Sequence, residues 1–185
     1  MKMKLGILTF PNTTSYGAVL QMYALYRAAE RLGGEPEIIN YLNSYMKNQR
    51  HTAAMQCGGM KRRVKLVAKN LMHARQLRGF RRFEKTLCKY PPRAIDQPEA
   101  LKALADRYGG VICGSDQVWN PDITGNDSRY FLDFCGPNTR RIAYAPSFGI
   151  QEFSSEFKEQ IRPQLRQFDA LSARENPGKI VTEEL

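Results

Sequence analysis

The sequence lacks any long hydrophobic run. The apolar stretch near its start, LGILTF, has six residues, fewer than a signal peptide core or a membrane-spanning helix requires. Cysteine is also scarce: Cys57, Cys88, Cys113 and Cys135 show neither the spacing of metal ligands nor that of a disulfide framework. We therefore expect a cytoplasmic chain with reduced thiols and no metal site.

The usual motifs of nucleotide binding are missing as well. No G-x-G-x-x-G or Walker A pattern is present, which excludes a dinucleotide-binding or P-loop motif. The two histidines, His51 and His73, lie beside no nucleophile or metal-ligand set, so we interpret both as surface residues. With 42% hydrophobic and 25% charged residues in 185, the chain has the composition of a single globular domain.

Positive charge is abundant in one segment. The formal net charge is +10, but Lys61 to Arg93 hold twelve lysines and arginines against one acid, Glu84, so the remainder is close to neutral. Apolar residues at helical spacing predict one or two amphipathic helices there. Phe80 and Phe83 fall on the apolar face and no nucleic-acid motif is present, so we expect no nucleic-acid partner. A helical cover over the sheet, contact with an anionic membrane surface, and non-catalytic binding of another polyanion remain open.

The rest of the chain alternates between strand and helix patterns. Strands are predicted at 4–10, 36–42, 110–113 and 140–149, the last of these turning at Pro146, with a further candidate at 169–175. Helices are predicted from about Gly17 to the Gly33-Gly34 stop, at 98–108 after a capping pattern of Asp96 and Glu99, at 154–168, and from 176 onward. This order predicts an α/β domain with a mainly parallel sheet.

Three strands end in polar loops: PNTTSYG at 11–17, GSDQVWN at 114–120 and APSFG at 145–149. Parallel strands place such loops along one edge of the sheet, where α/β proteins bind ligands near a switch in strand order. The first loop opens a helix, whose free N–H groups, together with nearby hydroxyls, suit an anion. Capping of that helix by Ser15 or Thr14 explains the same hydroxyls equally well.

The loop GSDQVWN holds more polar side chains than a turn requires. Asp116 is suited to act as a general base toward a sugar hydroxyl, or as a hydrogen-bond anchor. In the structural alternative, Asp116 only bends the loop and Trp119, the single tryptophan, fills the core. Arg174-Glu175, after the last strand candidate, is either a surface ion pair or part of the same cleft.

Taken together, these segments resemble one known family. GILTFPNTTSYGAVLQMYALYRA, IINY, GGVICGSDQVWNPD, YFLDF, RRIAYAPSFGI and FDALSARE, in this order, are similar to the polysaccharide pyruvyl transferases. The resemblance covers nearly the whole chain apart from about 43–95. It implies a glycosyltransferase-B-like fold of two Rossmann-like domains facing across a cleft. Residues 1–185 are then expected to form the single N-terminal domain, its sheet flanked by helices, with a basic helical insertion at about 43–95 and the C-terminal domain absent from this chain.

The resemblance also implies an activity. Family members are similar to enzymes that transfer the pyruvyl group of phosphoenolpyruvate, the donor substrate, onto sugar hydroxyls of cell-surface or exopolysaccharide precursors; no cofactor is expected. The implied partners are a sugar or lipid-linked saccharide acceptor and the C-terminal domain, which carries the histidine and arginines of the donor site. A location in the cytoplasm, with peripheral contact at the inner face of the membrane, fits these partners. One half of a nucleotide-sugar glycosyltransferase is the alternative, because the same fold serves that reaction.

The expected site residues come from the three loops and the resemblance. Asp116 is the expected catalytic base. The expected substrate contacts are Asn12, Tyr16, Gly17, Gln21, Gly114, Ser115, Gln117, Trp119, Asn120, Ser147 and Gly149.

Overall fold

The computed structural model describes residues 2–11, 13, 15–48, 74–86, 88–89, 91, 94–150 and 152–176. In chain order the elements are β1 (Lys4–Leu8), α1 (Tyr16–Arg31), β2 (Glu35–Ile39), α4 (Pro98–Ala105), β3 (Gly110–Cys113), α5 (Pro121–Thr124), the 3-10 helix η1 (Ser128–Phe131), β4 (Arg140–Ala143), α6 (Ser155–Leu165) and β5 (Ala170–Leu171). Helices at 44–48 and 74–86 lie within the predicted insertion. Cys57, both histidines, the basic residues 61–73 and the helix pattern beyond 176 lie outside the described residues.

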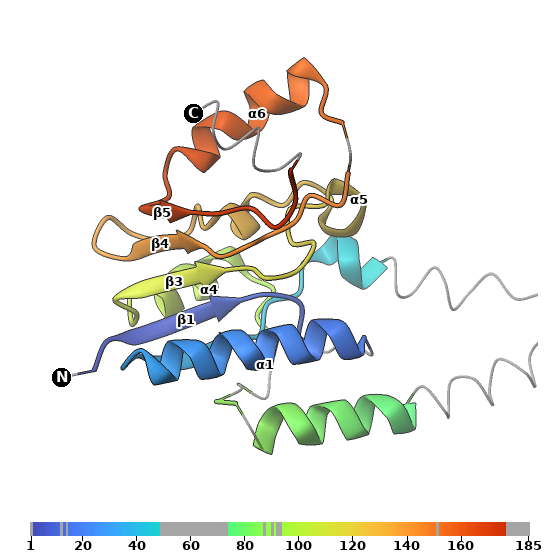
Figure 1. Ribbon diagram of the computed structural model, residues 1–185, viewed down its shortest axis with the longest axis vertical. Helices are drawn as coiled ribbons and strands as arrows, with labels where there is room; N and C mark the ends of the chain where they lie inside the picture. The colour runs from blue at the N-terminus through green and yellow to red at the C-terminus, as the bar shows by residue number, and fades with distance from the viewer. Residues whose placement is uncertain are drawn as a thin grey trace, which may run out of the picture.

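The five strands form one sheet in the order β2-β1-β3-β4-β5, and every neighbouring pair is parallel (Figure 1). The prediction of an α/β domain with a parallel sheet is therefore confirmed. The strand order reverses between β1 and β3, because the chain moves outward from β1 to β2 and then crosses back. Because all the strands are parallel, their carboxyl ends lie at one edge of the sheet. The switch point falls between the loops after β1 and β3.

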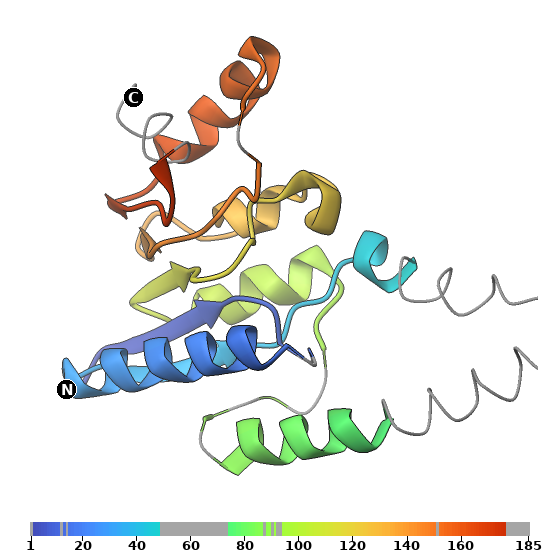
Figure 2. The ribbon, with the colours of Figure 1, turned by 45° about the vertical axis from the view of Figure 1, so that its right-hand side comes forward.

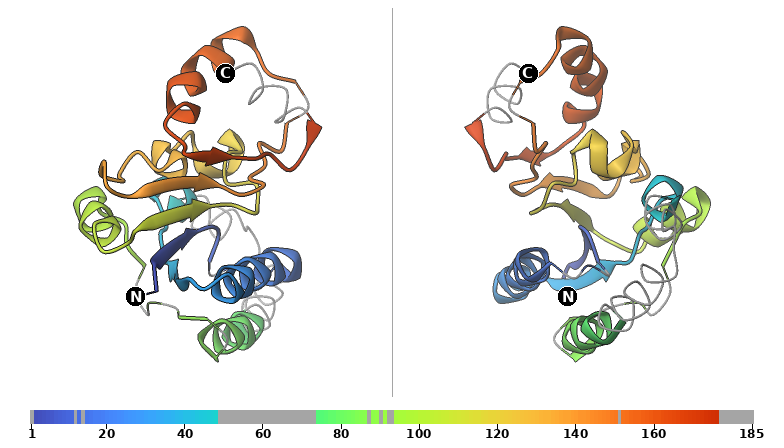
Figure 3. Two further views of the ribbon diagram at one scale, coloured as in Figure 1. Left: turned by 60° about the vertical axis from the view of Figure 1, so that its left-hand side comes forward. Right: turned by 90° about the vertical axis from the view of Figure 1, so that its right-hand side faces the viewer.

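Alternating side chains build a core on each face of the sheet. Ile7, Ile38 and Ile112 pack with the buried face of α1. Their chain neighbours Leu8 and Ile39 point to the other face, where α4, α6 and the connection between β3 and β4 supply the packing partners. Figure 3 shows α1 and α4 on opposite sides of the sheet. Both faces are covered, as parallel strands require.

The two ends of the segment between β2 and α4 lie next to each other beside the sheet. Tyr41, just beyond β2, forms a parallel bridge with Ile95. Helix 74–86 lies beside α1 (Figures 1 and 2), where two pairs of aromatic rings meet edge to face: Tyr16 with Phe80, and Tyr23 with Phe83. None of the described helices is long and apolar enough to cross a membrane.

Several predicted boundaries are wrong at the edge of the sheet. The strand predicted at 140–149 with a turn at Pro146 already ends at Ala143, and the candidate at 169–175 shortens to Ala170–Leu171. A side-chain hydrogen bond interrupts the strand ladder there, because Ala145 N–H donates to Ser172 Oγ at 3.0 Å and not to a backbone carbonyl oxygen. The predicted cap of α4 is also wrong: Gln97 is its N-cap residue, and the Asp96 carboxylate pairs with Lys47 instead.

Candidate functional site

The carboxyl ends of the central strands form a continuous edge held by backbone hydrogen bonds. Gly114 N–H donates to the Leu8 carbonyl oxygen at 3.1 Å and so joins the ends of β1 and β3. Tyr144 N–H donates to the Cys113 carbonyl oxygen at 2.9 Å and joins β3 to β4. The predicted loops after β1, β3 and β4 therefore start side by side along this edge, with the switch point between the first two.

The first of these loops begins α1 and is described only in part, because Asn12 and Thr14 lie outside the described residues. Ser15 is the N-cap residue: its Oγ accepts the N–H of Ala18 at 3.4 Å, and its own N–H donates to Thr13 Oγ1 at 3.1 Å. Capping by Ser15 is thus confirmed. Binding of an anion at this helix start stays a prediction.

The three α1 residues expected to contact substrate lie in the first turns of the helix. Tyr16 and Gly17 are exposed, and Gln21 is half-buried. The ring of Tyr16 lies against Phe80 of helix 74–86, with centroids 4.7 Å apart. The structure therefore places Tyr16 between the edge of the sheet and the basic helix.

The loop after β3 needs glycine at position 114. Gly114 has φ +120°, in the left-handed region that side chains oppose. A Cβ there would overlap the carbonyl oxygen of Tyr144. Gly114 therefore allows the loop to follow β3 past the end of β4, and its expected contact with substrate stays a prediction.

Asp116 lies half-buried in this loop, beside the half-buried Ser115. Its Oδ1 accepts the N–H of Gln117 at 2.7 Å, and its carbonyl oxygen accepts the N–H of Ser147 at 2.9 Å. Within the described part of the chain, Oδ2 has no hydrogen-bond partner. The carboxylate thus bends the loop, as the structural alternative predicted, and keeps one oxygen without a protein partner.

Gln117 and Asn120 form an amide pair that packs against the loop after β4. Asn120 Nδ2 donates to Gln117 Oε1 at 2.9 Å, while Asn120 Oδ1 caps α5 by accepting the N–H of Asp122. A Cβ on Gly149, whose φ is +66°, would lie 2.7 Å from Gln117 Oε1. The structure therefore brings residues 114–120 and 145–149 together, although their polar groups serve each other.

Trp119 fills the core beneath this loop. Its side chain is only 1% exposed, and Nε1–H donates to the Tyr130 carbonyl oxygen at 2.9 Å. The ring stacks on Phe131, with centroids 5.1 Å apart, and also contacts Phe148. The expected substrate contact is therefore corrected to a packing role, because burial leaves this ring no open surface.

The loop after β4 surrounds the carboxylate of Glu175. Ser147, itself 1% exposed, donates its hydroxyl to Glu175 Oε1 at 2.6 Å, and Phe148 N–H donates to the same oxygen at 3.1 Å. Gly149 N–H donates to Ser147 Oγ at 3.0 Å, and Arg174 Nε lies 3.4 Å from Glu175 Oε2. Glu175 therefore ties the chain after β5 to the loop after β4, which goes beyond a simple surface ion pair.

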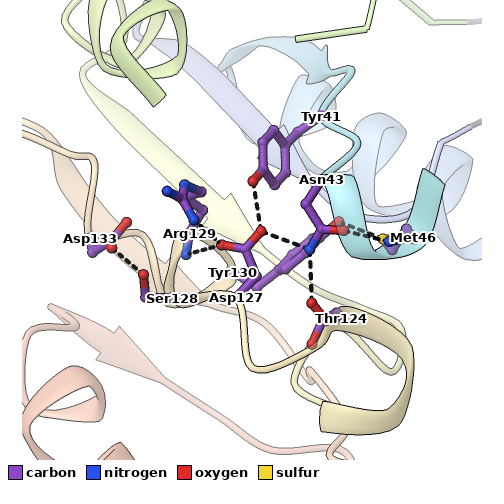
Figure 4. A network of polar contacts seen from close by, with 9 residues as sticks. All are labelled: Tyr41, Asn43, Met46, Thr124, Asp127, Ser128, Arg129, Tyr130 and Asp133. Carbon is purple, nitrogen blue, oxygen red and sulfur yellow. Dashed lines mark hydrogen bonds and ion pairs between the residues drawn. The ribbon is translucent and has the colours of Figure 1, made fainter. Parts of the chain in front are cut away.

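A polar cluster that was not predicted from the sequence lies where the chain after β2 meets the connection between β3 and β4 (Figure 4). Asp127 Oδ2 accepts from Tyr41 Oη at 2.6 Å and from Asn43 Nδ2 at 2.8 Å. Asp127 Oδ1 accepts the N–H of Arg129 at 3.1 Å and pairs with its guanidinium at 2.7 Å. The cluster borders a polar cavity of about 510 Å³. Tyr41 lies at the end of the predicted strand 36–42 and Asn43 follows it, and that position was the available signal.

The charges of this cluster are settled by its hydrogen bonds. Burial raises the pKa of Asp127, but hydrogen bonds from Tyr41, Arg129 and Asn43 outweigh burial and hold that pKa below its usual range. Burial and the neighbouring carboxylate raise the pKa of Tyr41. At neutral pH Asp127 is therefore ionised and Tyr41 is protonated. Because both carboxylate oxygens accept hydrogen bonds from the protein, Asp127 has a structural role, linking Tyr41, Asn43 and Arg129, and is not a free base.

The described cysteines are free, as predicted, and they lie in environments that suppress reactivity. Cys88, Cys113 and Cys135 are all buried. Burial raises the pKa of Cys88 to about 11 and that of Cys135 to about 12, and it raises the pKa of Cys113 as well. All three stay protonated at neutral pH and are poor nucleophiles. In the described ranges, no group of three or more His, Cys, Asp and Glu side chains is arranged to hold a metal ion.

Comparison with known proteins identifies one family. The family model described as "Polysaccharide pyruvyl transferase" matches residues 16–184. Searches of curated proteins and of solved structures gave no match. The matched range includes every expected site residue except Asn12.

Proposed function

The chain belongs to the polysaccharide pyruvyl transferase family, and from this premise we propose that it takes part in moving a pyruvyl group from phosphoenolpyruvate to the hydroxyls of a sugar. The proposed acceptor is a precursor of a cell-surface or exopolysaccharide. The observation that carries the proposal is the meeting of the loops after β1, β3 and β4 at one edge of the sheet, within the range that matches the family.

The reaction needs an acid, a base and cations. Protonation of the methylene carbon of phosphoenolpyruvate leaves a cation-like centre at the carbon that bears the phosphate. One sugar hydroxyl adds there and loses its proton to a base. A second sugar hydroxyl then replaces phosphate, which leaves with the C–O bonding electrons and takes up the proton of that hydroxyl. The products are a cyclic ketal and inorganic phosphate, so atoms and charges balance. Base catalysis of the hydroxyl step typically contributes 10²–10⁴-fold.

Asp116 is the proposed base. It is half-buried at the edge where the loops meet, and its Oδ2 lacks a hydrogen-bond partner within the described chain. The hydrogen bond from Gln117 N–H to Oδ1 fixes the carboxylate, so Oδ2 is held in one direction. Ser115, Gly114 and the first turn of α1 are the proposed acceptor contacts. The acid and the cations of the donor site are proposed to come from a second domain.

The test uses the product of the complete reading frame that encodes these residues. Phosphate release from phosphoenolpyruvate is measured with and without a panel of saccharide acceptors. The expected result is phosphate release that depends on acceptor, with the pyruvyl ketal detected on the sugar by mass spectrometry. Release of a nucleoside diphosphate from a nucleotide sugar, with no phosphate from phosphoenolpyruvate, contradicts the proposal and identifies a glycosyltransferase.

Asp116→Asn tests the base within the same assay. The amide keeps an oxygen to accept the Gln117 N–H, so stability is expected to stay within about 0.5 kcal/mol of wild type. Activity is expected to fall by about 100-fold or more. The matched control is Asp106→Asn. Asp106 is an exposed aspartate at the C-cap of α4, before the amino end of β3, and its substitution is expected to leave activity unchanged. Equal activity in both variants removes Asp116 from the mechanism.

A further inference from the structure

An apolar groove of about 340 Å³ runs between α1 and helix 74–86. Helix α1 contributes Tyr16, Val19 and Leu20 to its walls, and helix 74–86 contributes Gly79, Phe80 and Phe83, with Gln76 as the polar member. The volume lies within the range of small-molecule pockets. The groove begins at Tyr16, in the first turn of α1, and so opens beside the edge of the sheet described above.

The walls of this groove leave unusual apolar surface in water. Tyr16 is 68% exposed and Leu20 is 56% exposed, and Phe83 is also exposed. These residues are contiguous across the two helices, since Phe80 and Phe83 contact tyrosine rings of α1. A contiguous apolar patch of this kind marks a binding surface more often than an isolated exposed side chain does.

Gly79 keeps the groove open. It lies inside helix 74–86, where glycine is less favourable than alanine, and apart from its chain neighbours and the backbone of its own helix no atom lies within 4 Å of the position that a Cβ would take. The packing of the helices therefore does not require glycine there. A side chain at this position would enter the groove.

Positive charge borders the groove. Helix 74–86 carries five exposed cations, and in the described part of the chain none of them forms an ion pair: Arg75, Arg78, Arg81, Arg82 and Lys85. At 3.6 residues per turn, Arg75 and Arg82 lie beside the row of groove-lining residues, whereas Arg81 and Lys85 lie farther round the helix. The groove thus joins an apolar floor to a cationic rim on one side.

We propose that this groove binds the hydrocarbon chain of a lipid phosphate, with Arg75 and Arg82 holding the phosphate group. An apolar chain fills walls that offer one polar side chain, and an anionic head group matches cations that have no partner in the described chain. This inference goes beyond the proposed transfer reaction and does not depend on it, because binding is measured without turnover.

The probe is dodecyl phosphate, kept below the concentration at which it forms micelles and measured by equilibrium dialysis with the 185-residue chain. Dodecyl phosphate is expected to bind at least tenfold more tightly than inorganic phosphate or dodecanol. Gly79→Leu, which fills the groove, is expected to weaken binding at least tenfold. Its thermal midpoint is expected to match or exceed that of wild type, because leucine favours the helix and meets open space.

Two double variants distinguish specific binding of phosphate at the rim from general electrostatic attraction to the helix. Arg75→Gln with Arg82→Gln is expected to weaken binding roughly tenfold to thirtyfold. Arg81→Gln with Lys85→Gln removes the same charge and is expected to change binding less than threefold. Unchanged binding in Gly79→Leu, or equal losses in the two charge pairs, overturns the proposal. Equal losses together with competition by a single-stranded oligonucleotide identify a polyanion surface in its place.

Discussion

Replacing Asp127 with asparagine is the sharpest test of how the edge of the sheet is held. The Asp127 side chain is only 4% exposed, and its two oxygens accept from Tyr41, Asn43 and Arg129 (Figure 4). An asparagine amide has one acceptor oxygen in place of two, so it cannot accept all of these hydrogen bonds. If its oxygen faces Arg129, its NH₂ group faces Asn43 Nδ2, which is held as a donor because it also donates to the Thr124 carbonyl oxygen.

The size of the effect follows from the bonds lost. In the better orientation, the amide oxygen of the Asp127→Asn variant still accepts from Arg129, but the charge is lost. The amide NH₂ group of the variant donates to the Tyr41 hydroxyl oxygen, and the hydrogen bond from Asn43 is lost. Hydrogen bonds to a charged group contribute about 1.5–3 kcal/mol each, and the Arg129 contribution is reduced because that side chain is one-third exposed. We therefore expect Asp127→Asn to lower the free energy of unfolding by about 3 kcal/mol at neutral pH, and Tyr41→Phe by about 1.5 kcal/mol.

The effect should depend on pH in one direction. The pKa of Asp127 is lowered in the folded state, so its stabilising contribution is complete above the unfolded pKa of about 4 and is lost as pH falls through the folded pKa. The difference in stability between wild type and Asp127→Asn should therefore stay constant from pH 7 to 5 and shrink below about pH 4.

Urea unfolding, followed by the fluorescence of the single tryptophan, measures both quantities. Asp133→Asn is the matched control, because Asp133 is an exposed aspartate in the same connection and its substitution should cost less than about 0.5 kcal/mol. A loss below about 1 kcal/mol for Asp127→Asn, or a difference that does not shrink in acid, refutes the assignment of Asp127 as a buried, ionised structural residue.

Two further substitutions test the loops at the edge. Gly114→Ala should lower the free energy of unfolding by more than about 2 kcal/mol, because it combines a positive φ with overlap at Tyr144; Gly33→Ala, with φ +90° and open space, should cost only about 1 kcal/mol in the same urea titration. Equal losses would mean that the approach to Tyr144 has no effect. Glu175→Ala should cost about 2 kcal/mol and increase protease cleavage near 145–149, since the buried Ser147 hydroxyl loses its acceptor, whereas Glu175→Gln should cost about 1 kcal/mol. Wild-type stability and wild-type cleavage in Glu175→Ala would contradict the role of Glu175 in holding the chain after β5 to the loop after β4.

The elements of the sheet were predictable because their signals are local. The run Gly110–Cys113 is apolar and buried, and the apolar spacing along Tyr16–Arg31 marks the face of α1 that packs on the sheet. Ends of elements were less predictable. β4 and β5 stop early where the Ser172 side chain accepts a hydrogen bond from Ala145 N–H in place of a backbone carbonyl, and that exchange needs a partner from the neighbouring segment.

The candidate loops were found because polar residues directly follow apolar strands, but the contacts of single side chains were not. Gln117, Asn120 and Gly149 contact each other in the folded chain, and their expected contact with substrate stays a prediction. Trp119 shows the same limit, since a sequence shows one tryptophan and not the rings that enclose it.

The sequence by itself determined that the chain folds as an α/β domain with a parallel sheet and places polar loops at the carboxyl ends of its strands, because strand and helix periodicities extend over only a few residues. Tertiary structure alone decided which loops touch. Tyr41 and Asp127 are 86 residues apart, and Ser147 and Glu175 are 28 apart. The Tyr41–Asp127 contact depends on a strand order that reverses between β1 and β3, and the Ser147–Glu175 contact depends on the pairing of β4 with β5. No local pattern of residues encodes either arrangement.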